Sequence, residues 1–458
     1  MNLPQGWIEI KFENAVEKIS ILNELKIKQK DYLTEGLFPI IDQGEVFIGG
    51  YTNDVKKVIN CKIPAIIFGD HTRCVKYLSF KFCAGADGIK VFNHIGCYNP
   101  KLFFYFIQIL TKKIPDKGYA RHYQHLEKEY IPIPPLPEQQ RIVDKIDSLF
   151  SELDSGVTLL KTIKAQLAVY RQTVLKWAFE GKLTEEWRKE NLINVLTNIE
   201  EAPKSLTNDL LSIPEKWSYV FLSKLGDLSR GKSKHRPRND PKLFERGKYP
   251  FIQTGDVKAA KKYINTYSTQ YGEFGLKQSK LWRIGTLCIT IAANIAETAF
   301  LAIDACFPDS IVGFTADTNV VEAKYVDYFI QSAKIKLWAF APATAQKNIN
   351  LETLENLIIP YCSKSEQQAI VSAIESRLSV CDKLEQTIDQ TLALSASLRQ
   401  SILKKAFEGR LVPQDPNDEP AEKLLERIKA EKAAVLAKQK QTRKRGKKRP
   451  NLNQLSNK

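Results

Sequence analysis

The sequence RQTVLKWAFEGKL at residues 171–183 recurs almost unchanged as RQSILKKAFEGRL at residues 399–411. Nine of the 13 positions are identical. The same offset of 228 residues, without a gap, aligns EQQRIV at 138–143 with EQQAIV at 366–371. Chance does not give such a match over 46 residues without an insertion. The chain therefore contains an internal duplication, and this duplication decides how its fold is organised.

A longer and less similar block precedes each copy of the repeat. Both blocks open alike, with LPQGW at 3–7 and IPEKW at 213–217, and both close on an Ile-Pro pair. From this Trp to the Glu of the repeat, the first block has 131 residues and the second has 149. The plan of the chain is therefore variable block, fixed segment, variable block, fixed segment.

The fixed segments have the apolar spacing of long helices. From Ile142 to Trp177, apolar residues alternate at steps of four and three with a single exception at Gly156, which is a heptad stripe. Gly181 and Gly409 stand where helices commonly stop. Such a stripe must be buried, and the second copy is the simplest partner, although dimerisation between chains is the general alternative. Antiparallel pairing about a pseudo-two-fold axis predicts the two blocks at opposite ends of a rod.

The predicted fold class is α+β: two α/β domains, one for each variable block, separated by two long antiparallel coiled-coil helices, with a pseudo-two-fold internal repeat. Short apolar runs at 65–68, 220–222 and 287–290 predict strands, and residues 101–110 and 326–336 predict helices. The expected boundaries are a first domain at 1–136, a helix at 137–183, a linker at 184–212, a second domain at 213–364, a helix at 365–411, an extension with a short helix at 412–437, and a disordered basic tail at 438–458.

The charge and cysteine content limit the class of protein. The formal charge of +16 indicates a polyanionic partner, but nine Lys or Arg lie in the last 21 residues, which have no acid. No apolar run is long enough to cross a bilayer, and the N-terminus lacks the pattern of a signal peptide, so we expect a cytoplasmic protein. The eight cysteines form no CxxC pair. Two His-x2-Cys pairs, His71 with Cys74 and His94 with Cys97, offer a zinc alternative, but we expect reduced thiols, no metal and no cofactor.

This layout resembles the specificity (S) subunits of type I restriction–modification systems, the HsdS family. The resemblance rests on the Pro-x-x-Trp openings, PLPEQQRIV at 135–143, both AFEG endings and PQDPNDEP at 413–420. FGDHTR at 68–73 and IAANIA at 291–296 are similar to recurring elements of that family, with Ala296 where glycine is expected. The resemblance implies that each variable domain reads one half of an interrupted, asymmetric target in double-stranded DNA. It also implies that the helices dock two methyltransferase subunits and that motor–nuclease subunits supply cleavage.

In the first block, two polar clusters are candidates for DNA contact. The segment after a predicted strand supplies His71, Thr72 and Arg73, which suit base edges and phosphates. Its alternative is a surface turn closed by an Asp70–Arg73 pair. A second cluster lies beside the predicted helix, with a solvated basic face as its alternative, and consists of Lys117, Arg121 and His122, next to Tyr123.

In the second block, the densest basic segment contains Arg230, Lys232, Lys234, Arg236 and Arg238, with Gly and Pro residues that favour a loop. Further polar candidates with side chains that suit adenine or a turn are Gln253, Thr254, Asn294, Lys347 and Asn348.

Catalytic signatures are absent from the sequence. It contains no nucleotide-binding Gly-x4-Gly-Lys-Ser/Thr loop and no Asp/Asn-Pro-Pro-aromatic string of an amino-methyltransferase. We therefore expect a DNA reader that is not itself an enzyme. Two alternatives stay open: a coiled-coil scaffold whose blocks bind peptides, and the recognition subunit of a related system that cuts on both sides of its target or only methylates.

Overall fold

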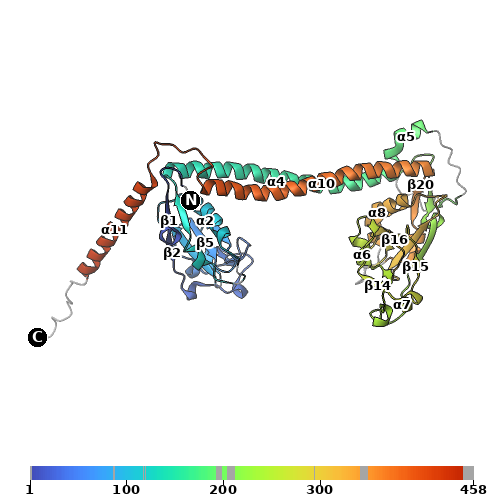
Figure 1. Ribbon diagram of the computed structural model, residues 1–458, viewed down its shortest axis with the longest axis horizontal. Coiled ribbons are helices and arrows are strands. Elements are labelled where there is room, and N and C mark those ends of the chain that lie inside the picture. The colour runs from blue at the N-terminus through green and yellow to red at the C-terminus, as the bar shows by residue number, and fades with distance from the viewer. Residues whose placement is uncertain are drawn as a thin grey trace. The chain divides into compact units, whose positions relative to one another are not determined.

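The computed structural model divides the chain into two compact units. Unit 1 comprises residues 1–160 and 390–458, and unit 2 comprises residues 161–389. Each unit contains one variable block together with part of each long helix (Figure 1). The residues that the structure describes are 3–85, 88–116, 118, 120–191, 199–203, 212–292, 294–340 and 349–446.

The two fixed segments form the helices α4 (Leu136–Phe179) and α10 (Lys364–Phe407), each of 44 residues. Both helices are followed by the expected glycine stop: Gly181 and Gly409 adopt φ angles of 70° and 67°, the left-handed region that glycine accepts most readily. The prediction of two long helices is therefore confirmed.

The helices pair antiparallel inside each unit. In unit 1, Ile142 near the start of α4 shares a buried core with Phe407 at the end of α10. In unit 2, Phe179 at the end of α4 shares a core with Ile370 near the start of α10. Because the start of one helix lies with the end of the other, the predicted antiparallel arrangement is confirmed. Trp177, which belongs to the predicted stripe, is instead 40% exposed.

Ion pairs across the helices repeat with the duplication. In unit 2, the guanidinium of Arg171 lies 2.6 Å from the carboxylate of Asp382. In unit 1, Arg399 pairs with Asp154. The offset of 228 residues relates Arg171 to Arg399 and Asp154 to Asp382, so the duplicated sequence makes a duplicated contact, one in each unit.

The first block is built on three small sheets. Its main sheet is antiparallel in the order β2 (Val16–Ile19), β8 (Ile89–His94), β5 (Ala65–Gly69) and β6 (Val75–Leu78). A second sheet has the order β4 (Gly50–Thr52), β3 (Phe38–Ile41) and β7 (Cys83–Ala84), and β1 (Ile8–Lys11) pairs with β9 (Tyr130–Ile133). The helix α2 (Pro100–Lys113) and the start of α4 belong to one hydrophobic core of the first block.

The second block repeats this plan with additional elements. Its main sheet has the order β11 (Gly226–Arg230), β19 (Ile311–Ala316), β16 (Leu287–Thr290), β17 (Thr298–Leu301) and β13 (Tyr263–Ile264). The other sheets are β14 (Thr269–Tyr271), β12 (Tyr249–Phe251), β18 (Ala305–Cys306) and β15 (Leu281–Trp282), and the pair β10 (Ser218–Phe221) with β20 (Ile358–Tyr361). The helix α8 (Ala323–Phe340) occupies the place of α2, and α6 (Thr254–Ala259), α7 (Glu273–Lys277) and α9 (Leu351–Glu355) are shorter.

Strand register shows that the two main sheets correspond residue by residue. Phe92 on β8 stands opposite Lys18 on one side and Ile66 on the other. Phe314 on β19 stands in the same way between Leu228 and Leu287. The edge strands β2 and β11 are therefore equivalent positions of one duplicated framework.

The EQQ motif of each repeat joins a block to its helix. The indole nitrogen of Trp7 donates to Glu138 at 2.9 Å, and that of Trp217 donates to Glu366 at 3.0 Å. The next residue, Gln139 or Gln367, is fully buried and donates its amide to the carbonyl of Cys97 or Cys362, respectively. The Pro-x-x-Trp opening and the EQQ motif are thus two halves of one buried joint, and this explains why both recur.

The glycine that ends each long helix completes the joint by close packing. A Cβ atom on Gly409 would lie 2.3 Å from Cγ of Pro4, so Gly409→Ala should combine left-handed strain with a clash. We expect a loss of about 2–4 kcal/mol in the free energy of unfolding. Gly285 has φ 86° and nothing within 4 Å of an added Cβ, so Gly285→Ala should lose only about 1 kcal/mol. Urea unfolding compares them, and equal losses would contradict the packing argument.

Two segments outside the repeats differ from the expected boundaries. The residues after α4 form η4 (Lys182–Thr184) and α5 (Glu185–Glu190), so the expected linker at 184–212 begins with helical structure. The C-terminal helix α11 (Ala421–Gly446) passes the expected end at residue 437, so the beginning of the basic tail is helical rather than disordered. Leu424 and Ile428 of α11 pack on the core of the first block. No helix within the described residues is long and apolar enough to cross a membrane.

Candidate nucleic-acid interface

The loop that follows β5 holds its arginine against the segment that follows α2. Arg73 adopts a φ of 60°, donates to the carbonyl of Ile114 at 3.0 Å, and forms an ion pair with Asp116 at 2.5 Å. The alternative of a surface turn closed by an Asp70–Arg73 pair is wrong, because Arg73 pairs with Asp116 and the carboxylate of Asp70 lies 3.7 Å from Lys90. The ring of His71 lies 3.0 Å from the carbonyl of Ala120, and the hydroxyl of Thr72 donates to the backbone of Gln43.

The second predicted cluster of the first block divides between core and surface. His122 is fully buried, with its Nδ1 atom 3.0 Å from the carbonyl of Asp70, so it presents no surface to a ligand in this conformation. The prediction of a DNA contact for His122 is corrected on this ground. Arg121 is exposed. Lys117 lies outside the described residues.

Arg121 lies at a groove of about 540 Å³ on the first block. Residues of β2 and β8 line the groove together with residues of the segment from Arg121 to Glu127. Its charged side chains are Lys18, Lys26, Asp70, Lys90, Arg121 and Glu127. Lys18 pairs with Glu127, and Lys90 lies 3.7 Å from Asp70, so the four cations outnumber the two carboxylates.

The predicted basic loop of the second block, residues 230–238, is held by contacts of its backbone and its arginines. The amide of Lys234 donates to the carbonyl of Gln278, and the hydroxyl of Ser279 donates to that of Lys232. Arg230 donates to the carbonyl of Asp309, and Arg238 pairs with the carboxylate of Asp309 at 2.8 Å. The loop is therefore a fixed scaffold for its charges.

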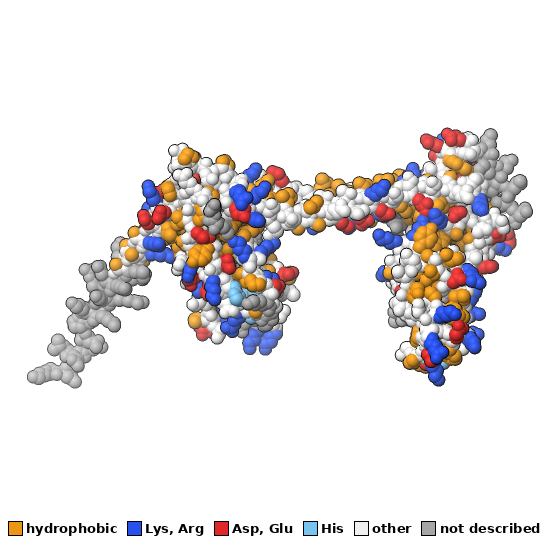
Figure 2. Space-filling model, viewed as in Figure 1, with side chains coloured by type: hydrophobic (Ala, Val, Ile, Leu, Met, Phe, Trp, Pro, Cys, Tyr) orange, Lys and Arg blue, Asp and Glu red, His pale blue; other side chains and the backbone are white. Residues whose placement is uncertain are grey.

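Three cations of this loop have no carboxylate partner within the described residues. The side chains of Lys232 and Lys234 are exposed, and Arg236 is exposed while donating only to backbone carbonyls. Lys and Arg side chains gather on the part of unit 2 that includes α7 (Figure 2). A fixed loop with unpaired cations suits the phosphates of a nucleic acid.

The amide candidates of the second block lie around α6. Gln253 caps this helix: its backbone amide donates to Asp256 at 2.8 Å, and Thr254 begins the helix. Asn294 accepts a hydrogen bond from Lys258 of the same helix at 3.3 Å. The structure thus brings Gln253 and Asn294 to one helix. Lys347 and Asn348 lie outside the described residues.

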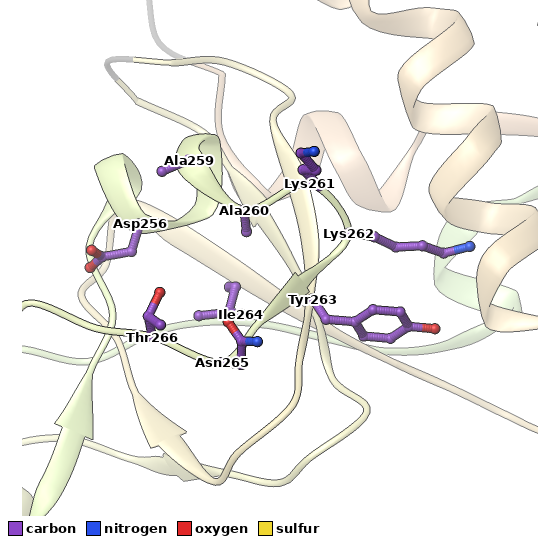
Figure 3. A pocket seen from close by; sticks show the side chains of 9 residues that line it. All are labelled: Asp256, Ala259, Ala260, Lys261, Lys262, Tyr263, Ile264, Asn265 and Thr266. Atoms are coloured by element: carbon purple, nitrogen blue, oxygen red, sulfur yellow. The ribbon is translucent and has the colours of Figure 1, made fainter. Parts of the chain in front are cut away.

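A cavity of about 410 Å³ lies beside α6 (Figure 3). Asp256 and Thr266 stand on one side of it, whereas Lys262 and Tyr263 extend in another direction (Figure 3). The ammonium of Lys262 pairs with Glu375 of α10, so this lysine is committed to holding the block on its helix. We therefore place no DNA contact on Lys262.

The zinc alternative gains no support. Within the described ranges, no three His, Cys, Asp or Glu side chains group as metal ligands. All eight cysteines are free thiols, and burial raises the pKa of Cys74 and raises that of Cys97 to about 12. Thiols with raised pKa values are protonated and poor metal ligands at neutral pH.

Sequence reasoning missed three residues of the first-block groove. Lys90 lies between Ile89 and Val91 on β8, and Lys18 lies between Glu17 and Ile19 on β2, as lysines on any exposed strand face do, so the sequence carries no signal for them. Gln124 lies three residues after Arg121, and only the fold shows that both line the groove.

Comparisons with known proteins agree with the duplicated plan. The family described as type I restriction modification DNA specificity domain matches residues 9–168 and 214–394. The EcoBI specificity subunit of a type I restriction enzyme from Escherichia coli is 27% identical over 74% of this chain and 73% of its own length. The EcoKI specificity subunit from Escherichia coli strain K12 is 27% identical over 66% and 64%.

Two solved structures share the fold. The HsdS subunit from Thermoanaerobacter tengcongensis has a TM-score of 0.57 and 19% identity, covering 90% of this chain and 99% of that one. A chain from a study of complex assembly and conformational transition in the type I restriction–modification system has a TM-score of 0.64 and 17% identity, covering 90% and 100%. With both specificity domains matched and the duplicated fold shared, the chain belongs to the type I restriction–modification DNA specificity family, as the repeat predicted.

Proposed function

We propose that each block reads one half of an interrupted DNA target and that the chain supplies sequence specificity to a type I restriction–modification enzyme. The readers are the expected domains at 1–136 and 213–364. The observation that supports this most is one sheet framework, repeated in register, that carries different polar surfaces in its two copies. Two unlike readers on equivalent frameworks suit two unlike half-sites. The relatives are themselves named specificity subunits, which supports a role without catalysis.

The paired helices carry apolar side chains that this chain leaves uncovered. Val169, Tyr170 and Leu384 are 67%, 39% and 47% exposed in unit 2, and Leu394 and Leu398 are 67% and 49% exposed in unit 1. Tyr170 and Leu398 are related by the repeat offset. Apolar surface at repeat-related positions suits two copies of one partner, so we assign this surface to two methyltransferase subunits. Motor–nuclease subunits would then supply cleavage.

A charge placed on this surface should weaken assembly. Val169→Glu is expected to lower the affinity for the methyltransferase subunit about tenfold or more, because the interface would bury an unpaired carboxylate. Val55→Glu is the matched control, since Val55 is a valine of the first block that is 65% exposed. Isothermal titration measures both variants. Equal affinities for the wild type and Val169→Glu would remove Val169 from the interface.

Mapping of methylated bases tests the proposed function. DNA from cells that contain this chain and its neighbouring methyltransferase is compared with DNA from a strain in which the gene is disrupted. We expect an interrupted two-part motif that loses methylation on disruption. If no motif changes although the methyltransferase is active, the specificity role is wrong, and a scaffold with peptide-binding blocks becomes the better explanation.

Salt dependence separates the DNA reader from the scaffold. Neutralising phosphates releases counterions, so binding of duplex DNA should weaken steeply with salt. Binding of a peptide need not. The remaining alternatives, a system that cuts on both sides of its target or only methylates, differ in the subunits that co-purify with the chain.

A further inference from the structure

The groove on the first block is the surface to which the structure gives a further role, and its polar side chains carry the argument. Arg121 and Gln124 are exposed and line the groove from the same short segment. Neither side chain has a hydrogen-bond or ion-pair partner among the described residues. A guanidinium can bind guanine bidentately, and a carboxamide can bind adenine in the same way. An Arg and a Gln that line one groove without a partner among the described residues therefore suit the edges of bases.

The remaining charges make the groove attractive to a polyanion. Lys18 and Lys90 place their ammonium groups 5.5 Å and 5.9 Å from the ring centre of Tyr123, which lines the same groove. Pairing of Lys18 with Glu127 and of Lys90 with Asp70 neutralises both carboxylates. The charge of Arg121 is therefore uncompensated at the groove, and a positive field favours the approach of DNA.

The internal repeat relates this groove to the basic loop of the second block. In the first block, Val91 on β8 stands between Ile19 on β2 and Ile67 on β5. In the second block, Gly313 on β19 stands in the same way between Ser229 on β11 and Cys288 on β16. Ser20, which lines the groove, therefore stands at the position of Arg230, where the basic loop begins. Each block thus presents its polar surface where the equivalent edge strand ends.

A second correspondence places Arg121 within the duplicated framework. The amide of His122 donates to the carbonyl of Asp70 at 2.9 Å, and the amide of Ile349 donates to that of Ile291 at 3.0 Å. These paired contacts make the segment that begins at Arg121 a repeated feature of the framework. The guanidinium of Arg73, in contrast, is already bound by the carboxylate of Asp116 and the carbonyl of Ile114.

We propose that this groove reads bases of one half of the DNA target, with Arg121 and Gln124 as the specificity-determining side chains. The proposal rests on the proposed function and names the reading surface of the first block. DNA enters with its major-groove base edges toward Arg121 and Gln124, and the lysines of the groove lie near its phosphates.

The test replaces both side chains in the full chain and measures DNA methylation in the presence of the methyltransferase. The variant Arg121→Ala/Gln124→Ala should reduce methylation of the wild-type motif about tenfold or more, or relax positions in one half of it only. Lys128→Ala is the matched control, because Lys128 is exposed on the same segment outside the groove, and it should keep the wild-type motif. Lys232→Ala/Lys234→Ala changes the basic loop of the second block, so it should alter methylation without relaxing the half of the motif that Arg121→Ala/Gln124→Ala relaxes. Circular dichroism and the midpoint of thermal unfolding should match the wild type, since neither replaced side chain has a partner in the part of the chain that the structure describes.

The outcomes separate the two proposals. If the wild type yields no interrupted motif, the proposed function fails. If the wild type yields a motif and the folded double variant retains both its sequence and its methylation level, the groove is not the reader. A set of targets in which each base of either half is replaced in turn is compared with the wild-type target. If the variant lowers methylation by the same factor on all of them, the groove binds phosphates only and the base-reading role is overturned. The single variant Gln124→Glu adds a check, because its carboxylate should exclude adenine without removing packing.

Discussion

Replacing Lys232, Lys234 and Arg236 with alanine is expected to weaken binding of duplex DNA about 100-fold at physiological salt. Each cation that neutralises a phosphate contributes about 0.9 to the slope of log affinity against log salt, so three contribute roughly 2.7. The expected result is therefore a loss of affinity together with a flatter salt dependence. Fluorescence anisotropy with a labelled duplex, titrated at several salt concentrations, measures both quantities.

The same three-charge change elsewhere in unit 2 is the control. Lys189, Lys216 and Lys224 lie outside the basic loop, and Lys189 and Lys224 already pair with Glu185 and Glu200. Their replacement with alanine changes the net charge equally but should alter the slope little, because DNA would not displace counterions there. If both triple variants lose the same affinity and slope, the effect comes from net charge alone and the loop has no special place in DNA binding.

Glu366→Gln is expected to destabilise unit 2 by about 3 kcal/mol, whereas Glu138→Gln should cost unit 1 about 1 kcal/mol or less. Both carboxylates are buried and accept the indole of the opening tryptophan. Glu366 also pairs with Arg188, whose side chain is 18% exposed, so loss of the carboxylate leaves a partly buried guanidinium without its counter-charge. Glu138 has no cation within ion-pair distance in the described structure, and burial raises its pKa. A neutral amide replaces such a group at little cost.

Chemical unfolding of each variant measures this difference, and a second replacement isolates its cause. In the double variant Glu366→Gln/Arg188→Gln, the stranded charge is removed and most of the lost stability should return. Because the pKa of Glu138 is raised in the folded state, the folded chain binds more protons than the unfolded chain at pH values above the ordinary pKa of a glutamate. The contribution of Glu138 to the free energy of unfolding therefore falls as the pH rises from that ordinary pKa through the raised pKa. Equal losses in Glu366→Gln and Glu138→Gln at neutral pH would contradict the role given to Arg188.

The predictions that succeeded from sequence all rest on local pattern. A heptad stripe specifies a helix with an apolar face, and a second copy in the same chain supplies its partner, so α4, α10 and their antiparallel pairing could be predicted. The glycine stops at 181 and 409 need only local backbone geometry. Strands at 65–69 and 287–290 are short apolar runs between turn residues. The family assignment follows from the same repeated motifs.

The candidate site could be predicted only in part, because loop side chains take their directions from distant contacts. Arg73 is held by Asp116, 43 residues away, and His122 by Asp70, 52 residues away. Lys18 and Lys90 become neighbours because β2 and β8 pair, and that register is set by burial of one sheet face. A basic residue in a loop has the same local sequence signature whether it points outward or inward.

Sequence alone thus determined the duplication, the two helices, their mutual orientation and the family, because each follows from spacing along one chain. Tertiary structure decided which charged residues reach the surface, that the EQQ and Pro-x-x-Trp motifs form one buried joint, and that Arg121 and Gln124 share a groove. The physical reason is the range of the interactions. Periodicity fixes an element from its neighbours, whereas a hydrogen bond or ion pair between loops depends on packing that brings distant segments together.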